Sequence, residues 1–481
     1  MDENKVDINS LIGFFLIGLI FIGWLYLNPP PPTPVVTQEE NSEVNEENES
    51  PIQDFSEVLS QSNTNESEDS NLSFENSLSE KNELVRIDTE KFIIEFSTLG
   101  GQISSLELKG QLNYLGEPIN LIQSGNSTFN LDFTTKNGRI FNTKDQTFVS
   151  SINDRGSVKQ VSMKLLVSED VFIEYLYSVN LDDYIIDLDI NSRGFYNILD
   201  TSKRYNLNWE LNAYRNSKSI SYENRYSYLT YFHDDDKIDY LSISGDDEDD
   251  EENVNWISFK QHFFSSVIIA ENDNPFKNVE FKSEDLVQDN DTDTLYTKKF
   301  ISKIPFDYSN NEFDNSLKFY FGPNQYSQLE TYDIGLEESI DFGWGIFGFI
   351  NKNVFVPLYR FLSSLFPYGI AIIFMTIIVR IVLAPVLYKS YLSQAKMKIL
   401  RPELDEINKK FKDNAMKRQK EMMSLYRKAG ANPMSGCLPG LLQIPVFYAL
   451  FMFFPSAFDL RQKSFLWADD LSAYDSILDF G

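Results

Sequence analysis

The sequence predicts a multi-domain membrane protein that combines an α-helical transmembrane bundle, a large extracytoplasmic all-β domain and a cytoplasmic helical hairpin. Three observations predict this: uncharged apolar runs long enough to cross a bilayer, a long segment in which apolar and polar residues alternate, and one basic segment in an acidic chain. The 481 residues carry a formal net charge of −30. This charge argues against a nucleic-acid-binding protein.

Three segments are predicted to cross the membrane. Residues 11–27 contain no charge and lie at the short end of the roughly 17 to 25 residues that span a ~30 Å core. Residues 368–388 and 437–454 are the second and third. The first run could instead be a cleaved signal peptide. An anchor is favoured, because residues 1–10 hold three acids and one lysine and no small-residue cleavage site follows.

The distribution of charge predicts the orientation of these spans. From Lys389 to Lys428 there are twelve basic and five acidic residues, a net charge of +7, so the rest of the chain carries −37. Lys and Arg accumulate in cytoplasmic loops, which places residues 389–434 in the cytoplasm. By parity, the segment 28–365 is translocated and the N-terminus, residues 1–10, is cytoplasmic.

The translocated segment divides into a linker and a folded domain. Residues 28–83 are rich in Pro at first and then in Asn, Ser, Glu and Gln, which predicts a disordered linker. Residues 84–330 show period-two alternation, for example at Ile186, Leu188 and Ile190, and are predicted to form one large antiparallel β-sandwich. The acidic run 245–253 is expected to be a solvated loop, because consecutive like charges repel each other.

Two helical regions flank the second span. Residues 340–365 are aromatic and amphipathic, which predicts an interfacial helix at the outer membrane surface. Within 389–434, apolar residues at spacings of three and four predict a helix, and a second helix should end at Gly430. These helices are predicted to form a basic antiparallel hairpin, with a plain solvated loop as the alternative. The apolar seam of the first helix comprises Met397, Leu400, Leu404, Ile407 and Phe411.

Catalytic signatures are scarce. The chain has two histidines, His233 and His262, and lacks the short motifs of zinc proteases, serine hydrolases and phosphate-binding loops. We therefore expect no catalytic residue, no metal site, no cofactor and no enzymatic activity. His262 is expected to be a packed strand residue rather than a ligand.

One charged residue interrupts the second span. Placing Arg380 inside a bilayer costs about 2.5 to 3.5 kcal/mol on insertion scales. Snorkelling would have to cover about 12 Å of helix to Tyr388, and no predicted span contains Asp or Glu as a partner. The remaining explanation is a water-filled cavity open to the cytoplasm and lined by Arg380 and Gln443. On the residues alone, these explanations stay open.

Several stretches of the sequence match a known family. They are TLGGQISSLELK (98–109), WISFKQHFFSSVI (256–268), YFGP (320–323), DFGW (341–344), IVRIVLAPV, QAKMKILRPELDEI, QKEMMSLYRKAGANPMSGCLPGLLQIPVFYALF and LRQKSFLWADDLSAYD. Together they resemble the YidC membrane protein insertase family. The resemblance covers roughly residues 84–481, and the first two stretches resemble the periplasmic domain of Gram-negative members.

The resemblance implies an insertase and chaperone that inserts and helps fold membrane proteins in the bacterial inner membrane, with or without the Sec translocon. It implies a periplasmic β-supersandwich and a hydrophilic groove with a central arginine. The groove and substrate-contact residues would be Arg380, Thr376, Gln443, Ile444, Pro445 and Phe447. The residues that contact ribosomes or targeting factors would be Lys409, Lys410, Lys412, Lys417 and Arg418.

The implied partners are nascent membrane proteins, the ribosome, the signal-recognition targeting machinery, Sec translocon components and membrane lipids, without a specific nucleic acid. Because the family has further spans after the loop at 455–481, the sequence is expected to be truncated at its C-terminus. The alternative function is a membrane-anchored periplasmic domain that binds or modifies carbohydrate, since a fold alone does not determine function.

Overall fold

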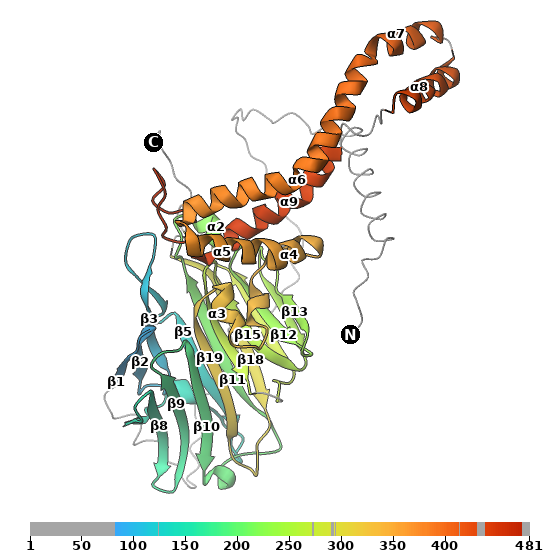
Figure 1. Cartoon of the computed structure of the whole chain (residues 1–481). Coiled ribbons are helices and arrows are strands. Elements are labelled where there is room, and N and C mark those ends of the chain that lie inside the picture. The colour runs from blue at the N-terminus through green and yellow to red at the C-terminus, as the bar shows by residue number, and fades with distance from the viewer. Residues whose placement is uncertain are drawn as a thin grey trace, which may run out of the picture. The chain divides into compact units, whose positions relative to one another are not determined.

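The computed structural model describes residues 82–473 apart from 124, 272–273, 290–292, 294, 413 and 431–437, and of residues 438–442 it describes the backbone. The predicted first span (11–27), the segment before it and nearly all of the predicted linker (28–83) lie outside these residues. The described chain comprises an all-β domain followed by a helical region (Figure 1). The predicted all-β domain is therefore confirmed.

Within the described residues, nineteen strands form three sheets in which neighbouring strands pair antiparallel. The nine-stranded sheet contains, in spatial order, β13 (Lys237–Tyr240), β12 (Tyr228–His233), β15 (Val254–Lys260), β16 (Phe264–Ala270), β19 (Asp314–Pro323), β10 (Ile185–Arg193), β9 (Val171–Asn180), β8 (Val158–Ser168) and β7 (Val149–Asp154). The six-stranded sheet contains β14 (Asp247–Glu251), β17 (Val279–Asp285), β18 (Tyr296–Phe306), β11 (Tyr205–Tyr214), β5 (Ser127–Thr134) and β6 (Ile140–Asn142). The four-stranded sheet contains β1 (Leu84–Asp88), β2 (Phe92–Ser97), β3 (Ile103–Leu112) and β4 (Pro118–Ile122).

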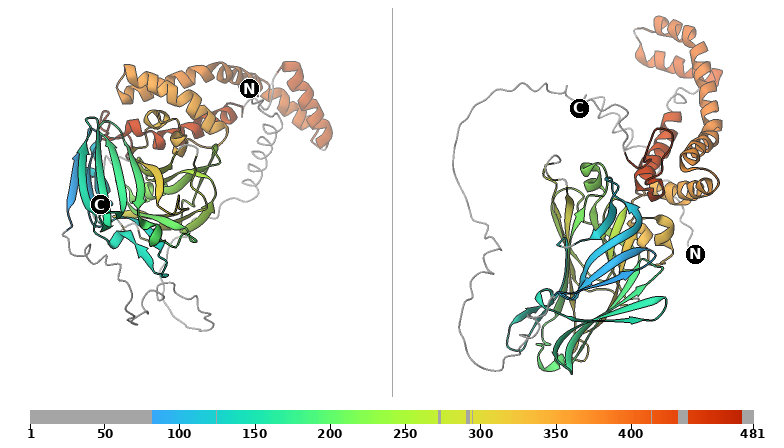
Figure 2. Two further views of the ribbon diagram at one scale, coloured as in Figure 1. Left: turned by 90° about the horizontal axis from the view of Figure 1, so that it is seen from below. Right: turned by 90° about the vertical axis from the view of Figure 1, so that its left-hand side faces the viewer.

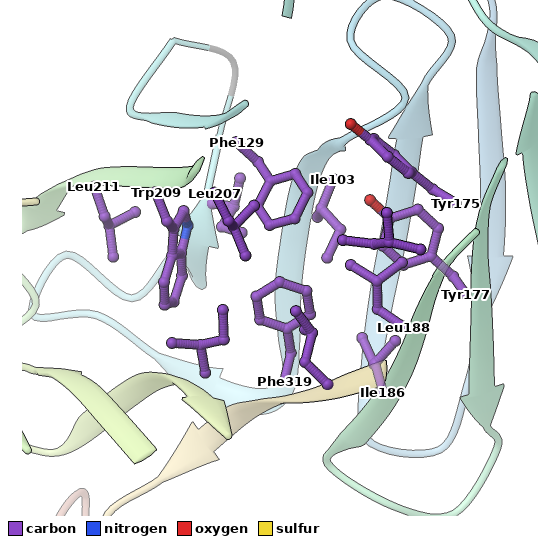
Figure 3. Close-up of a cluster of buried hydrophobic side chains, with 14 of the residues drawn as sticks. Ile103, Phe129, Tyr175, Tyr177, Ile186, Leu188, Leu207, Trp209, Leu211 and Phe319 are labelled. Atoms are coloured by element: carbon purple, nitrogen blue, oxygen red, sulfur yellow. The ribbon is translucent and has the colours of Figure 1, made fainter. Parts of the chain in front are cut away.

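The three sheets share one hydrophobic core. Successive side chains of a strand point to opposite faces, so strictly alternating burial along β11 directs Leu207, Trp209 and Leu211 into this core. Figure 3 shows these side chains opposite Phe319 of β19 and Leu188 of β10. The rings of Trp209 and Phe319 meet edge to face with centroids 5.5 Å apart. The period-two pattern therefore corresponds to the sheet faces that are buried between layers (Figure 2).

The acidic run 245–253 is not the solvated loop that its charge predicts. Residues Asp247–Glu251 form β14, the edge strand of the six-stranded sheet. An edge strand leaves its carboxylates in water, and here Glu248 lies directly opposite Lys282 of β17. The Tyr231 hydroxyl also donates a hydrogen bond to Asp249, at 2.7 Å. These partners offset the repulsion within the run.

The helical region contains most of the described helices. They are α3 (Tyr326–Glu330), α4 (Ile346–Ile350), α5 (Val356–Leu365), α6 (Tyr368–Ile399), α7 (Arg401–Lys410), α8 (Ala415–Ala429) and α9 (Leu438–Ser456). A π-helical turn at Asn351–Phe355 joins α4 to α5. Elsewhere lie α2 (Ile220–Arg225) and the 3₁₀ turns Thr143–Asp145, Phe195–Asn197, Leu336–Ser339 and Phe458–Leu460.

Local sequence explains the ends of the basic helices. Pro402, in the first turn of α7, lacks an N–H group, so the helix that starts at Tyr368 breaks at Leu400. The predicted seam from Met397 to Phe411 therefore spans two helices rather than one. The Asn414 side chain caps α8, and Gly430 ends it in the left-handed conformation at φ 58°.

Candidate functional site

A second hydrophobic cluster joins the helical region to the β-domain. Ala371 and Met375 of α6 and Ala449 of α9 are fully buried in it. Figure 1 shows α6 and α9 side by side. The β-domain contributes Trp256, Val267, Ile269 and Tyr320, and the segment that includes α5 contributes Phe342, Phe355, Val356, Tyr359 and Leu362. One end of α6 and one end of α9 are therefore fixed by packing.

Polar contacts reinforce this junction. The Nε2 atom of His262, in the bend between β15 and β16, donates to the carbonyl oxygen of Pro455 at 2.9 Å. Burial and then the nearby charge of Lys260 lower the pKa of His262 to about 3. His262 is packed, as predicted, but it lies in a turn rather than in a strand. It contacts a helix that follows 193 residues later in the chain.

Two further side chains tie the segment after α9 to the β-domain. The amide of Gln325 donates to Asp459 at 2.6 Å. The guanidinium of Arg461 donates to the carbonyl oxygen of Leu112 and stands over the ring of Phe264, 4.9 Å from its centre. Arg461 is almost fully buried. These contacts hold the end of α9 against the strands.

A buried amide fixes α9 to the π-helical turn. Asn351 is fully buried, and its side-chain N–H groups donate to the carbonyl oxygens of Phe342 (2.7 Å) and Ala449 (2.8 Å). Among the described residues, its own side-chain oxygen has no hydrogen-bond partner. The π turn widens the helix and directs this side chain toward α9. The sequence offered only a weak signal for Asn351, one polar residue among aromatic ones.

Beyond the packed end, α6 presents Thr376 and Arg380. Arg380 follows Thr376 by four positions, so the two residues lie on the same face of the helix. Thr376 donates its hydroxyl to the carbonyl of Ile372 at 2.9 Å. Arg380 is exposed, and within the described part of the chain its guanidinium has no hydrogen bond or ion pair. The structure thus contains no described partner that would neutralise this charge.

Gln443 of α9 lies about as far from the packed end of its helix as Arg380 lies from the packed end of α6. Gln443 precedes Phe454 by eleven residues, about 16 Å, and Arg380 follows Tyr368 by twelve, about 18 Å. Gln443 is half-buried, whereas Ile444 and Phe447 are exposed by 58% and 68%. Pro445 leaves the carbonyl of residue 441 without its helical N–H donor.

The predicted basic residues gather around the turn between α7 and α8. Lys409, Lys410, Lys412 and Lys417 are exposed, and Arg418 is partly exposed. Lys410 and Lys417 lie over the ring of Phe411 at 5.8 Å and 5.3 Å from its centre. None of the five forms an ion pair with another described residue. Their charges are therefore available to an acidic partner.

Among the described residues, α6 is the one helix that is both long and apolar enough to cross a membrane. Its 32 residues correspond to about 48 Å, so it exceeds a ~30 Å core. The helix continues without a break beyond the predicted end of the span at 388, through residues 389–399. The apolar part of α9 whose side chains are described, Gln443–Ser456, is shorter.

Two protein-family models match this chain. A family model described as the YidC periplasmic domain matches residues 84–357, and one described as a 60 kDa inner membrane protein matches residues 358–480. The chain belongs to the YidC family. The membrane protein insertase YidC of Parabacteroides distasonis is 36% identical over 98% of this chain and 78% of that protein.

Solved structures are more distant. A crystal structure of an active YidC insertase with its first transmembrane domain resolved is 18% identical, over 82% of this chain and 77% of that one, with a TM-score of 0.29. A galactose mutarotase-like protein from Lactobacillus casei is 9% identical, over 50% of this chain and 100% of that one, with a TM-score of 0.33.

Proposed function

We propose that this chain is a membrane protein insertase of the bacterial inner membrane. Its membership of the YidC family and the naming of its relatives as membrane protein insertases support this. The observation that carries the mechanism is Arg380, an exposed arginine without a described partner on the long apolar helix α6. In this proposal α6 and α9 span the bilayer.

A hydrated groove would make this arginine tolerable and useful. An isolated charge in hydrocarbon is costly, so a guanidinium at this depth is tolerable only where water reaches it. Thr376, on the same face of α6, and Gln443, on α9, would line the groove with further polar groups. A nascent chain would then move its polar tail into water inside the membrane rather than into hydrocarbon. Acidic tails would also be attracted by the charge of Arg380.

The exposed face of α9 would guide the apolar part of the substrate. Ile444 and Phe447 offer large apolar side chains that no described residue covers fully. Pro445 between them interrupts the helical hydrogen bonding. An entering transmembrane segment would pack along this face while its polar end lies near Arg380. No covalent step is involved, so the protein would act as an insertase and chaperone rather than as an enzyme.

The basic hairpin α7–α8 would face the cytoplasm and contact ribosomes and the signal-recognition targeting machinery. Its exposed lysines suit the phosphate backbone of ribosomal RNA or an acidic protein surface. The N-terminus would be cytoplasmic and the β-domain periplasmic. Sec translocon components and membrane lipids complete the proposed partners.

The segment 340–365 would lie on the outer membrane surface. Trp344, Phe349 and Phe361 are exposed by 61% to 64% and would contact lipid. The two cations of this segment form ion pairs with glutamates that come before it in the chain. Arg360 pairs with Glu330 at 3.6 Å, and Lys352 pairs with Glu338. A carbohydrate-active domain is not favoured, since relatives named as insertases match nearly the whole chain.

Substitution of Arg380 tests the proposal. In cells depleted of their own insertase, Arg380→Lys should retain most insertion, because a diffuse attraction to a moving tail requires charge rather than guanidinium geometry. Arg380→Ala and Arg380→Glu should fail for substrates with acidic tails and succeed for those with neutral tails. Lys389→Ala, which removes an exposed cation further along α6, serves as the matched control.

Thermal stability measured on the same variants distinguishes a structural role. If Arg380 held a buried group in place, Lys and Ala would fail equally and both would lower the melting temperature, since breaking a buried pair costs about 3 to 5 kcal/mol. That result would refute the groove. Normal insertion by all three variants would refute a role for Arg380 altogether.

A further inference from the structure

The segment after α9 ends in a tight turn that exposes two large apolar side chains. Phe465 and Ala468 exchange backbone hydrogen bonds of 2.9 Å and 3.0 Å, and Leu466 and Trp467 form the tip between them. Leu466 is 76% exposed and Trp467 is 69% exposed. Leu466 also adopts φ 56°, a left-handed conformation that is unusual for a residue with a branched side chain. The turn thus holds apolar groups in solvent with a strained backbone.

Hydrogen bonds make the base of this turn rigid. The carboxylate of Asp470 accepts from the backbone N–H groups of Gln462 (3.0 Å) and Ser472 (2.8 Å). The N–H of Leu471 donates to the carbonyl of Lys463 at 3.0 Å. The tip is therefore held away from the body of the protein rather than free to collapse onto it.

Contacts with the start of α6 locate the tip. The ring of Phe465 covers Gly369 so closely that a Cβ atom there would overlap the ring. The ammonium of Lys463 stands 5.0 Å from the centre of the Tyr368 ring. Tyr368 and Gly369 are the first two residues of the apolar helix. The turn therefore sits at the level at which α6 begins.

We propose that the Leu466–Trp467 turn is a lipid anchor that inserts into the outer leaflet of the membrane. This inference rests on the proposed span α6, because the start of that helix then marks the outer interface. Trp is enriched at this depth, where its ring is buried among acyl chains and its N–H stays near water. Exposed Leu365 and Phe366, just before α6, continue the apolar surface. Burial in lipid would offset the strain at Leu466, and the anchor would fix the outer ends of α6 and α9.

Spin-label accessibility in lipid nanodiscs tests the anchor. The chain has one cysteine, so labels would be placed at Leu466→Cys or Trp467→Cys in a Cys437→Ser background. Collision with oxygen, which concentrates in lipid, is compared with collision with a water-soluble nickel chelate. We expect oxygen collisions at the tip to exceed nickel collisions several-fold. Ile140→Cys, a similarly exposed apolar residue of β6 in the β-domain, should show the reverse.

A third label separates this inference from the proposed function. Val382 is 70% exposed and lies two residues after Arg380, roughly on the opposite side of α6. If the tip label collides with the nickel chelate and the label at Val382→Cys does not, the anchor is refuted and the span is kept. A tip closed to both reagents also overturns the anchor, since protein would then cover it. If the label at Val382→Cys collides with the nickel chelate, the proposed span is refuted, and the anchor is refuted with it.

A second measurement covers the case in which the cysteine variants fail to fold. Brominated acyl chains quench tryptophan fluorescence by contact. The quenching of the native protein minus that of Trp467→Phe reports on Trp467 directly. A clear difference supports the anchor, and equal quenching of the two proteins overturns it.

Discussion

The imidazole of His262 donates a hydrogen bond from Nε2 to the carbonyl oxygen of Pro455, 2.9 Å away. A carbonyl can only accept, so the Nε2 atom of His262 carries a proton, and the lowered pKa of the buried ring favours the neutral tautomer protonated there. Pro455 lies in the last turn of α9, where carbonyl groups lack an N–H partner within the helix. The β-domain therefore caps the helix that bears the proposed substrate face.

This contact predicts a pH-dependent stability of the junction. The pKa of His262 is about 6.5 in the unfolded chain and about 3 in the folded protein, mainly because of burial. The stability that it contributes is complete above pH 6.5 and is lost as the pH falls from 6.5 toward 3, since only the unfolded chain takes up the proton. At pH 5 the loss should be about 2 kcal/mol. Thermal unfolding of the purified protein at pH 7 and pH 5 measures it.

The control is His262→Gln, whose side-chain N–H can still donate to Pro455 but does not titrate. Its melting temperature should fall less than that of the native protein between pH 7 and pH 5. Equal falls in the two proteins would show that other groups account for the acid sensitivity.

Gly369 should not tolerate a larger side chain. In Gly369→Ala the new Cβ would overlap the ring of Phe465, so the ring must move, at a cost of about 1 to 3 kcal/mol. Phe465→Ala removes the obstacle. The double variant should therefore lose less unfolding free energy than the two single variants lose together, by at least about 1 kcal/mol. Denaturant or thermal unfolding of the four proteins measures this coupling; strictly additive losses would contradict the contact.

Asn351→Asp should destabilise the protein more than Asn351→Leu. Leu leaves two carbonyl groups without a donor, whereas Asp also places carboxylate oxygens against the carbonyls of Phe342 and Ala449. We expect Asn351→Leu to lose about 1 to 3 kcal/mol and Asn351→Asp to lose more. The matched control is Asn353→Leu, which removes an exposed amide of the π-helical turn that donates to the carbonyl of Phe349 in α4. Equal stability of the Leu and Asp variants would contradict the buried hydrogen bonds.

Ribosome binding by the hairpin should depend on charge. Replacing Lys409, Lys410, Lys412, Lys417 and Arg418 together with Gln should weaken co-sedimentation with ribosomes, and binding of the native protein should fall as salt rises, because charges are screened within about 10 Å at 0.1 M. The same exchange at five exposed cations of the β-domain should have no effect. Those control residues are Arg139, Arg155, Arg193, Lys203 and Lys277. Salt-independent binding would point to the apolar seam instead.

The sequence by itself determined the features that depend on neighbouring residues. The alternation of apolar and polar residues around Ile186 and Leu188 predicted a strand, because alternate side chains of a strand point to one face. The apolar run after Tyr368 predicted a long helix, and Gly430 predicted the end of α8. The motifs around these elements predicted the family. The roles of Arg380, Gln443 and the basic residues remain predictions.

The tertiary structure decided the features that depend on distant partners. The acidic run became an edge strand because Lys282 and Tyr231 lie beside it, which its own composition cannot indicate. His262 meets Pro455 across 193 residues, and no local pattern encodes that contact. Asn351 is likewise explained only by the carbonyl of Ala449 on another helix. Hydropathy and spacing report which side chains are buried, whereas only packing decides which buried groups meet.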